Sequence, residues 1–436
     1  MRNDARVSGR PAFRAASPLI PLLLLAAVVG PAQAGGWNGE EVVKDGVTHV
    51  MNPAESLERP TTIELEEAWR IGGEDDEEIF GVITDIIADD EGNFYLLDAQ
   101  RNEIKVYSAD GEPLRTIGRE GEAPGEFRGA YSMFRLPGGN LGVLQAFPSK
   151  IVVLTPQGDA AGEYPLPDVP DGGFRVLFAA EYAGDNLALL YGVNQPSESG
   201  FTQTSVLAWV DATGEKEVRL HSQDASMSAT TALIAENEWD VFRNRWTASS
   251  DGRAFSAVNF GEYSINVWDS EGRLDRVIHR EYADHVRTDE EKERRLEIYR
   301  GFTRRVEIPD IQYEIEDRFN PILTLEARDD GTLWVQTSRG ANGLEEGIAA
   351  VFDVFDENGR FVRQVTLEGE GDALNDRYFF VKDRMFVVTD FLHALMELRG
   401  GGETGNDDDE DEDEAQDDDE DEEEAELMQI ISYRLE

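Results

Sequence analysis

The chain has 436 residues, of which 40% are hydrophobic and 9% aromatic, and it contains no cysteine. Its formal net charge of -50 argues against nucleic acid, whose phosphates require a basic surface, and against anionic lipid. Without cysteine, the sequence excludes disulfides, thiolate chemistry and lipid attachment through a cysteine.

The first 34 residues have the pattern of a secretory signal peptide. Four arginines precede an apolar stretch, Leu19–Val29, which is too short to span a bilayer, and Ala32-Gln33-Ala34 fits a cleavage site. We therefore expect residues 1–34 to be removed and the mature protein to be soluble in the periplasm or outside the cell. No later stretch is long and apolar enough to predict a membrane span.

Four strand-like runs follow one another between Val82 and Gly118. Each run is rich in β-branched or aromatic residues, and the turns at Asp90–Asn93 and Ala109–Gly111 have the Asp, Asn and Gly of hairpins. Four such runs joined by turns predict one four-stranded antiparallel sheet.

The turn signals return along the chain with a period of about 47 residues, the signature of a repeat protein. The turn between the third and fourth strands can be placed five times, at Asp110-Gly111, Gly158-Asp159, Asp211–Gly214, Asp269–Gly272 and Asp356–Gly359. Repeated four-stranded sheets of this size predict the blades of a β-propeller.

A sixth blade is divided between the two ends of the chain. Three strands are expected at Arg377–Val381, Arg384–Thr389 and Met428–Arg434, and Glu66–Gly72 resembles the fourth strand of the first repeat. Closing the ring in this way leaves no incomplete blade with an exposed edge. We therefore predict an all-β fold, a six-bladed β-propeller of four-stranded antiparallel blades. Its boundaries are residues 63–436, after an N-terminal lead-in at 35–62.

Blade one also resembles a known repeat family. Gly92–Asp98, Ile104–Tyr107 and Asp110-Gly111 look like an NHL repeat, and Gly118–Phe127 resembles the linker of bacterial six-bladed propellers of this type. Arg101 and Glu103 stand where the family often has Asn and Arg. The resemblance implies the fold and a role in holding a ligand or contacting a protein. It does not imply one activity, because binding modules, lactonases and lyases share this fold.

Four segments depart from the repeat and should lie on one face of the ring. In an up-and-down blade, the loop between the second and third strands and the link to the next blade emerge on the same side. The four insertions are expected at 192–204, 222–240, 280–320 and 391–426. Elaborated loops on one face are typical of a binding site at the mouth of the channel.

The 280–320 insertion, between blades four and five, is expected to contain a helix. Thr288 with Glu291 forms a capping-box pattern, and apolar residues recur on one stripe of the segment that follows. The simpler interpretation is a purely structural helix that packs on the blades through this apolar stripe. Its other face has Arg294, Arg295 and Arg300, which are either solvated or candidates to contact an anionic or carboxylate group of a ligand.

The 391–426 insertion contains two acidic runs and is predicted to be a disordered loop, because such runs repel themselves and have nothing to bury. The main interpretation is a solvating loop. Weak binding of Ca²⁺ or another hard cation is the alternative, although the alternating ligands of a defined calcium loop are missing. The candidate ligands are Asp407, Asp408, Asp409, Asp417, Asp418 and Asp419.

No catalytic motif is found. The five histidines show no metal-binding spacing, and there is neither a nucleophile elbow nor a phosphate-binding glycine loop. Lactonase-like and lyase-like propellers hold a divalent metal at the channel mouth, and this resemblance makes Asp85, Asp98, Asn259 and Asp390 candidates to face a ligand. Asp98 and Asp390 also fit a simpler role, capping the ends of strands.

These observations favour a secreted, non-catalytic propeller that binds an unknown protein, peptide or carbohydrate, and that acts as a monomer. The alternative is a divalent-metal-dependent hydrolase or lyase of the lactonase-like class, and a structural surface-assembly protein comes third. An enzyme of that class requires metal ligands that converge on the axis, whereas a binding module requires a pocket rimmed by loops.

Overall fold

The structure is a computed structural model. It describes residues 36–74, 76–169, 172–197, 200–228, 233–239, 244–304, 311–400 and 427–435. The expected signal peptide and the acidic runs after residue 400 lie outside these ranges.

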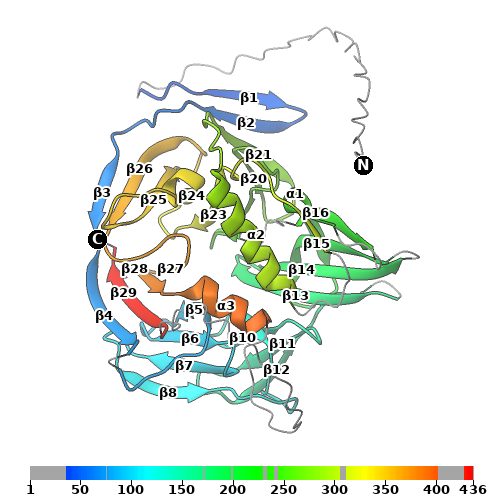
Figure 1. Ribbon diagram of the computed structural model, residues 1–436. Helices are drawn as coiled ribbons and strands as arrows, with labels where there is room; N and C mark the ends of the chain where they lie inside the picture. The colour runs from blue at the N-terminus through cyan, green and yellow to red at the C-terminus, as the bar shows by residue number, and fades with distance from the viewer. Residues whose placement is uncertain are drawn as a thin grey trace, which may run out of the picture. The chain divides into compact units, whose positions relative to one another are not determined.

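The described residues form six antiparallel blades arranged as a ring (Figure 1). The protein is therefore a six-bladed β-propeller, as the turn pattern predicts. Blade one consists of β5 (Ile83–Ala88), β6 (Phe94–Asp98), β7 (Glu103–Tyr107) and β8 (Pro113–Ile117), and blade two consists of β9 (Ala130–Arg135), β10 (Leu141–Gln145), β11 (Lys150–Leu154) and β12 (Ala160–Tyr164). Blade three consists of β13 (Phe174–Ala183), β14 (Asn186–Ser197), β15 (Gly200–Asp211) and β16 (Glu217–Ser228), and blade four consists of β18 (Trp246–Ala248), β19 (Ala254–Ser256), β20 (Ser264–Trp268) and β21 (Leu274–Arg280). Blade five consists of β23 (Ile322–Ala327), β24 (Leu333–Thr337), β25 (Ile348–Phe355) and β26 (Phe361–Glu368), and blade six consists of β27 (Arg377–Val381), β28 (Arg384–Val388), β29 (Gln429–Arg434) and β4 (Glu66–Gly72).

The hydrophobic core is divided into layers between neighbouring blades. Each layer combines side chains of two adjacent blades; Phe94 and Phe386, for example, meet edge to face between blades one and six, with ring centroids 4.8 Å apart. Similar layers lie between each of the other pairs of neighbouring blades. The alternation of apolar residues along the strands produces this arrangement, because successive side chains point to opposite faces of a blade.

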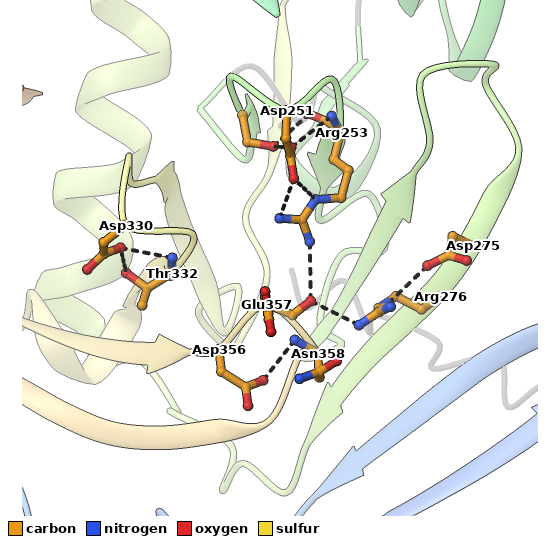
Figure 2. Close-up of polar contacts among 10 residues, drawn as sticks. Asp251, Arg253, Asp275, Arg276, Asp330, Thr332, Asp356, Glu357 and Asn358 are labelled. Carbon is orange, nitrogen blue, oxygen red and sulfur yellow. Dashed lines mark hydrogen bonds and ion pairs between the residues drawn. The ribbon is translucent and has the colours of Figure 1, made fainter. Parts of the chain in front are cut away.

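Aspartates at the hairpins fix the turns of the blades (Figure 2). Asp330 accepts hydrogen bonds from the backbone N–H and the hydroxyl of Thr332, and Asp356 accepts one from the N–H of Asn358. Such side-chain-to-backbone bonds explain why the turn signals contain Asp. Figure 2 also shows Arg253 and Arg276 of blade four, which both donate to the carbonyl of Glu357 in blade five, at 3.2 and 3.0 Å.

A strand from the N-terminal part of the chain and the last strand meet in blade six. β29 pairs antiparallel with β4, and this pairing is the one that the sequence predicts for Glu66–Gly72 and the C-terminal strand. Ile430 and Ile431 of β29 are fully buried. The last blade is thus held together by segments more than 350 residues apart in the sequence.

The expected lead-in forms strands of its own. β1 (Glu40–Lys44) and β2 (Val47–Asn52) make a hairpin, and β2 adds parallel to β21 at the outer edge of blade four. β3 (Thr61–Glu64) adds parallel to β26 of blade five. The propeller boundary predicted at residue 63 therefore falls within β3. The chain from β2 to β4 runs along the outer edges of blades four and five before it enters blade six.

The insertions between blades contain short elements that contact each other. β17 (Leu233–Ala235) is followed by α1 (Glu236–Trp239), and β17 pairs parallel with β22 (Gln312–Glu314). The predicted helix is α2 (Asp289–Thr303), and its Thr288–Glu291 capping box is present. A short 3-10 helix, η1, follows β24 at Ser338–Gly340. The insertion predicted at 192–204 proves to be the lengthened hairpin of β14 and β15 rather than a loop.

The interpretation of 391–426 as one disordered loop is wrong for its first ten residues. They form helix α3 (Phe391–Gly400). Phe391, Ala394 and Leu398 lie on one helical stripe and pack on the core layer between blades six and one. The acidic composition of the rest of the insertion concealed this apolar period.

Candidate functional site

The first strand of each blade presents polar side chains in two tiers. Counted back from the residue that closes the first hairpin of its blade, three of these residues stand four positions earlier and three stand two positions earlier. The closing residues are Asp89, Leu136, Val381, Ala183, Ser249 and Arg328. Two positions along a strand separate the tiers by about 7 Å. The first tier comes from blades one, two and six and the second from blades three, four and five: Asp85, Ser132 and Arg377, then Glu181, Thr247 and Glu326.

Four of these side chains accept a hydrogen bond from the backbone of the next blade. The repeated contact follows from the parallel arrangement of the first strands around a ring, because each side-chain oxygen reaches an amide that has no partner in its own sheet. The bonds are Met133 N–H to Asp85 Oδ2 (2.8 Å), Ala180 N–H to Ser132 Oγ (3.5 Å), Ala248 N–H to Glu181 Oε2 (2.6 Å) and Ala327 N–H to Thr247 Oγ1 (3.3 Å).

Glu326 and Arg377 differ from the other four. Among the residues that the structure describes, neither side chain makes a hydrogen bond or a close ion pair. The carboxyl groups of Asp85 and Glu326 nevertheless attract the guanidinium of Arg377 electrostatically. Both side chains are partly exposed and yet strongly desolvated. A carboxyl and a guanidinium inside a ring of blades, with unused hydrogen-bonding capacity, are available to bind a ligand.

The carboxyl groups of this axial cluster, defined as Asp85, Glu181, Glu326 and Arg377, have raised pKa values. Loss of bulk water raises the pKa of Asp85 to about 6, although hydrogen bonds and Arg377 oppose the rise. Desolvation and the charge of Glu326 raise the pKa of Glu181 to about 8, and desolvation raises that of Glu326 to about 7. Burial lowers the pKa of Arg377, against the attraction of Asp85 and Glu326. Carboxyl groups that titrate near neutrality are typical of functional sites.

The raised pKa of Glu181 predicts a measurable effect on stability. The folded protein holds this proton up to about pH 8, whereas the unfolded chain releases it near the ordinary glutamate pKa of 4.5. Stability contributed through this group therefore falls as the pH rises between these values. We expect Glu181→Gln to raise the free energy of unfolding by on the order of 1 to 3 kcal/mol at high pH and to change little below about pH 5.

Urea unfolding at several pH values measures this effect. The exposed Glu112 makes no side-chain hydrogen bond in the described part of the chain, so Glu112→Gln is a matched control. An equal effect of Glu181→Gln at all pH values would contradict the raised pKa.

Helices α2 and α3 lie at the end of the ring nearer to the first tier. Arg399 of α3 stacks on Tyr131, the residue before Ser132, and on Phe302 of α2, with 5.1 and 5.5 Å from the guanidinium carbon to the ring centroids. Gly301 of α2 lies against Met396 of α3 so closely that an added Cβ would be 3.0 Å from the sulfur. In Figure 1 the two helices are drawn across the middle of the ring.

Of the four predicted ligand-facing residues in the blades, the structure places Asp85 in the axial cluster and the other three elsewhere. Asp98 is fully buried and accepts hydrogen bonds from the N–H groups of Gly81 and Val82, at 2.8 and 3.2 Å, so it caps the end of a strand. Asn259 is exposed in the loop before β20 and donates to Glu262 (2.9 Å). Asp390 precedes α3, where its backbone N–H donates to Asp376 (3.0 Å).

The three arginines of α2 contact acidic groups of the protein itself. Arg294 lies 4.0 Å from Glu290 and Arg300 lies 3.1 Å from Glu293, and all four side chains are exposed. Arg295 contacts the buried Glu236 at 2.9 Å. We therefore assign Arg295 to the attachment of α2, whereas the exposed pairs are weak enough for a ligand to displace.

The two remaining questions from the sequence concern metal binding and pockets. Within the described ranges, no group of three or more histidine or acidic side chains is placed to hold a metal ion. The six aspartates proposed for weak cation binding lie outside those ranges. Surface hollows of about 200 and 280 Å³ lie on blade one, beside Lys105 and Arg115, and next to residues 341–348, away from the axial cluster.

The sequence contained a signal for the axial residues that we did not use. Glu181, Glu326 and Arg377 each interrupt a first strand that is otherwise mostly apolar, two or four residues before the hairpin. Aligning the repeats on that hairpin, instead of on the turn between the third and fourth strands, would have brought these residues together with Asp85.

Comparison with known proteins supports no assignment beyond the fold. Neither a protein-family model nor a curated protein matches the sequence. A member of the DUF4221 family from Bacteroides vulgatus has 11% identity and a TM-score of 0.46, over 84% of this chain and 97% of that one. A putative exported protein from Bacteroides fragilis has 12% identity and a TM-score of 0.43, over 86% and 99%. A gluconolactonase from Xanthomonas campestris has 8% identity and a TM-score of 0.38, over 84% and 98%.

None of the helices that the structure describes has the length and the apolar composition needed to cross a membrane.

Proposed function

We propose that the protein is a secreted, non-catalytic binding propeller whose axial cluster holds a small ligand with a protonated amine and a hydrogen-bond acceptor. The observation that carries the proposal is the pair formed by Glu326 and Arg377. Both side chains lie within the ring without a hydrogen bond to the described protein residues, and their charges are opposite. A ligand with both kinds of group would satisfy both side chains.

The balance of charge favours an amine over a purely anionic ligand. Three carboxyl groups share the cluster with one guanidinium, and desolvation keeps Glu181 and Glu326 largely or partly protonated near neutrality. A bound ammonium group would stabilise their ionised forms, because an opposite charge nearby lowers the pKa of a carboxyl group. Binding should therefore release protons at neutral pH.

The place of action rests on the sequence. The apolar segment at 19–29 with its arginines and its Ala-x-Ala site supports export, and the strongly acidic composition fits a soluble protein outside the cytoplasm. Amines present in that compartment, such as amino sugars, amino acids and polyamines, are the ligand class that we propose.

A thermal-shift screen with matched pairs of amines and neutral analogues tests the proposal, glucosamine against glucose being one pair. We expect the stabilising compounds to be amines, and their titration in two buffers of different ionisation enthalpy to show proton release. Glu326→Gln and Arg377→Met should each weaken binding by about tenfold or more, equal to about 1.4 kcal/mol. Glu112→Gln is the control. If amines bind equally well to all variants, or if no amine stabilises the protein, the proposal is wrong.

A further inference from the structure

The β1–β2 hairpin, residues 40–52, pairs with the propeller along the edge formed by β2, and we call it the N-terminal ribbon. One exposed ion pair also joins Glu41 of β1 to Arg360 of blade five, at 2.8 Å. β2 pairs in parallel with β21, whereas every residue of β1 is exposed. The ribbon adds outer strands to a blade that already has its four. It can therefore leave blade four without opening the ring.

Asn52 fixes the C-terminal end of the ribbon. Its side chain is 3% exposed, donates to the carbonyls of His279 and Gly359 (both 2.9 Å) and accepts from the N–H of Phe361 (2.7 Å). These bonds connect the end of the ribbon to blades four and five at one buried point. The Asn52 side chain also accepts a hydrogen bond from the indole N–H of Trp37 (3.0 Å). Loss of a buried polar residue with four satisfied hydrogen bonds is costly, so this end should stay in place when the rest moves.

A pair of histidines lies next to this anchor. Nδ1 of His49 in β2 is 2.9 Å from Nε2 of His279 in β21, and the two rings meet edge to edge with centroids 5.2 Å apart and planes 10° apart. The residues are 230 positions apart in the sequence. This contact joins a side chain of β2 directly to a side chain of β21.

The hydrogen bond between His49 and His279 requires a single proton between the two facing nitrogens. One nitrogen must donate and the other must accept, so the bond exists with neutral rings or with one ring charged. When both imidazole rings carry a positive charge, both facing nitrogens are N–H donors, and neither can accept. Two nitrogens then cannot remain as close as 2.9 Å without repulsion. Repulsion at this distance then opposes the pairing of β2 with β21.

The charged groups around the pair do not remove this repulsion. Glu262, in the loop before β20, favours the charged form of His279, but burial and the neighbouring His49 lower the pKa of His279 overall. On β1, Val42 is the residue paired with His49, and Glu40 and Lys44 lie on the same face with opposite charges. Glu281, just beyond the end of β21, is exposed to solvent.

We propose that the His49–His279 contact is a proton-operated latch that releases the N-terminal ribbon from blade four on acidification while the propeller stays closed. The direction follows from linkage. A histidine whose pKa is lower in the folded state than in the unfolded state contributes stability above the ordinary value of 6.5, and this contribution is lost as the pH falls below it. The latch is therefore closed at neutral pH and opens in mildly acidic surroundings.

Hydrogen exchange of the full chain, measured by mass spectrometry at about pH 7.5 and about pH 5 and corrected for intrinsic rates, tests the latch. Exchange of residues 47–50 and 276–278 should accelerate by about tenfold or more at the lower pH, while residues 83–98 in blade one stay protected. Equal protection of the ribbon at both pH values overturns the proposal.

Two variants assign the effect to the pair. The double variant His49→Gln/His279→Gln keeps two neutral hydrogen-bonding groups, so its ribbon should exchange at the same corrected rate at both pH values. His49→Lys places a permanent charge beside His279 and should exchange at neutral pH as the unmodified protein does at the lower pH. If the double variant shows the same acceleration on acidification as the unmodified protein, other groups are responsible and the proposal fails.

Discussion

Deletion of residues 427–436 is expected to abolish the folded propeller. The deletion removes β29, which lies between β28 and β4 in blade six, so that β4 loses its only described partner strand and the ring cannot close. Ile430 and Ile431 are fully exposed to solvent in the unfolded chain and fully buried here. Loss of each such side chain costs about 2 to 5 kcal/mol, and the total stability of a domain is about 5 to 15 kcal/mol.

Thermal unfolding followed by near-ultraviolet circular dichroism measures this loss, with an absent or strongly shifted transition as the expected result. A control deletion of residues 407–424 shortens the chain further but keeps β29. A C-terminal deletion that unfolds at the midpoint of the full chain would show that the closure of blade six contributes little.

The second large effect is expected at Glu236. Its side chain is 1% exposed and accepts hydrogen bonds from both terminal nitrogens of Arg287 (2.5 and 2.8 Å) and from the backbone N–H of Glu316 (3.0 Å). Arg295 of α2 contacts the same carboxylate. The residue thus connects α1 to α2 and to the segment before β23.

Glu236→Ala should detach these insertions from each other. Arg287, which is 4% exposed, would remain as a buried cation without its partner, and such a loss costs about 3 to 5 kcal/mol. We expect faster hydrogen exchange in residues 233–239 and 289–303, with little change in blades one and two. The exposed pair of Arg294 with Glu290 provides the control, because Glu290→Ala should cost at most about 1 kcal/mol. Similar effects of the two substitutions would refute the role of Glu236.

The cluster at Glu236 also bears on the proposed binding site. It attaches α2 firmly, whereas α3 is held by the apolar stripe with Phe391 and by the stacking of Arg399 on Tyr131 and Phe302. A ligand that enters past the helices would therefore displace α3 more readily than α2. The raised pKa values of Glu181 and Glu326 then make the occupancy of the site depend on pH.

The repeated features of the fold could be predicted from the sequence because they are local. A hairpin aspartate such as Asp356 bonds to backbone groups two and four residues away, so its turn is visible in a short window. The capping box of Thr288 and Glu291 is local in the same sense. The split blade could be inferred as well, because Glu66–Gly72 has the pattern of a fourth strand without the three that should precede it.

Helix α3 and the three N-terminal strands were missed for different reasons. The apolar period that ends at Leu398 was concealed by the acidic residues that follow it, and β3 has only four residues, three of them exposed. A short strand that adds to the edge of a finished blade needs no strong pattern of its own, because its partner strand supplies the hydrogen bonds.

The sequence by itself determined the blade, its number of copies and the closure of the ring, since each depends on residues within one repeat or on a strand left over at one end. Only the tertiary structure decided which side chains meet on the axis and where the histidines lie. Glu181 and Glu326 come from blades three and five, and His49 meets His279 across 230 residues. A repeat period fixes the position of a residue within its blade, but the side chains it meets depend on the closed ring and on the path of the first strands. Those long-range contacts form only when the whole chain is folded.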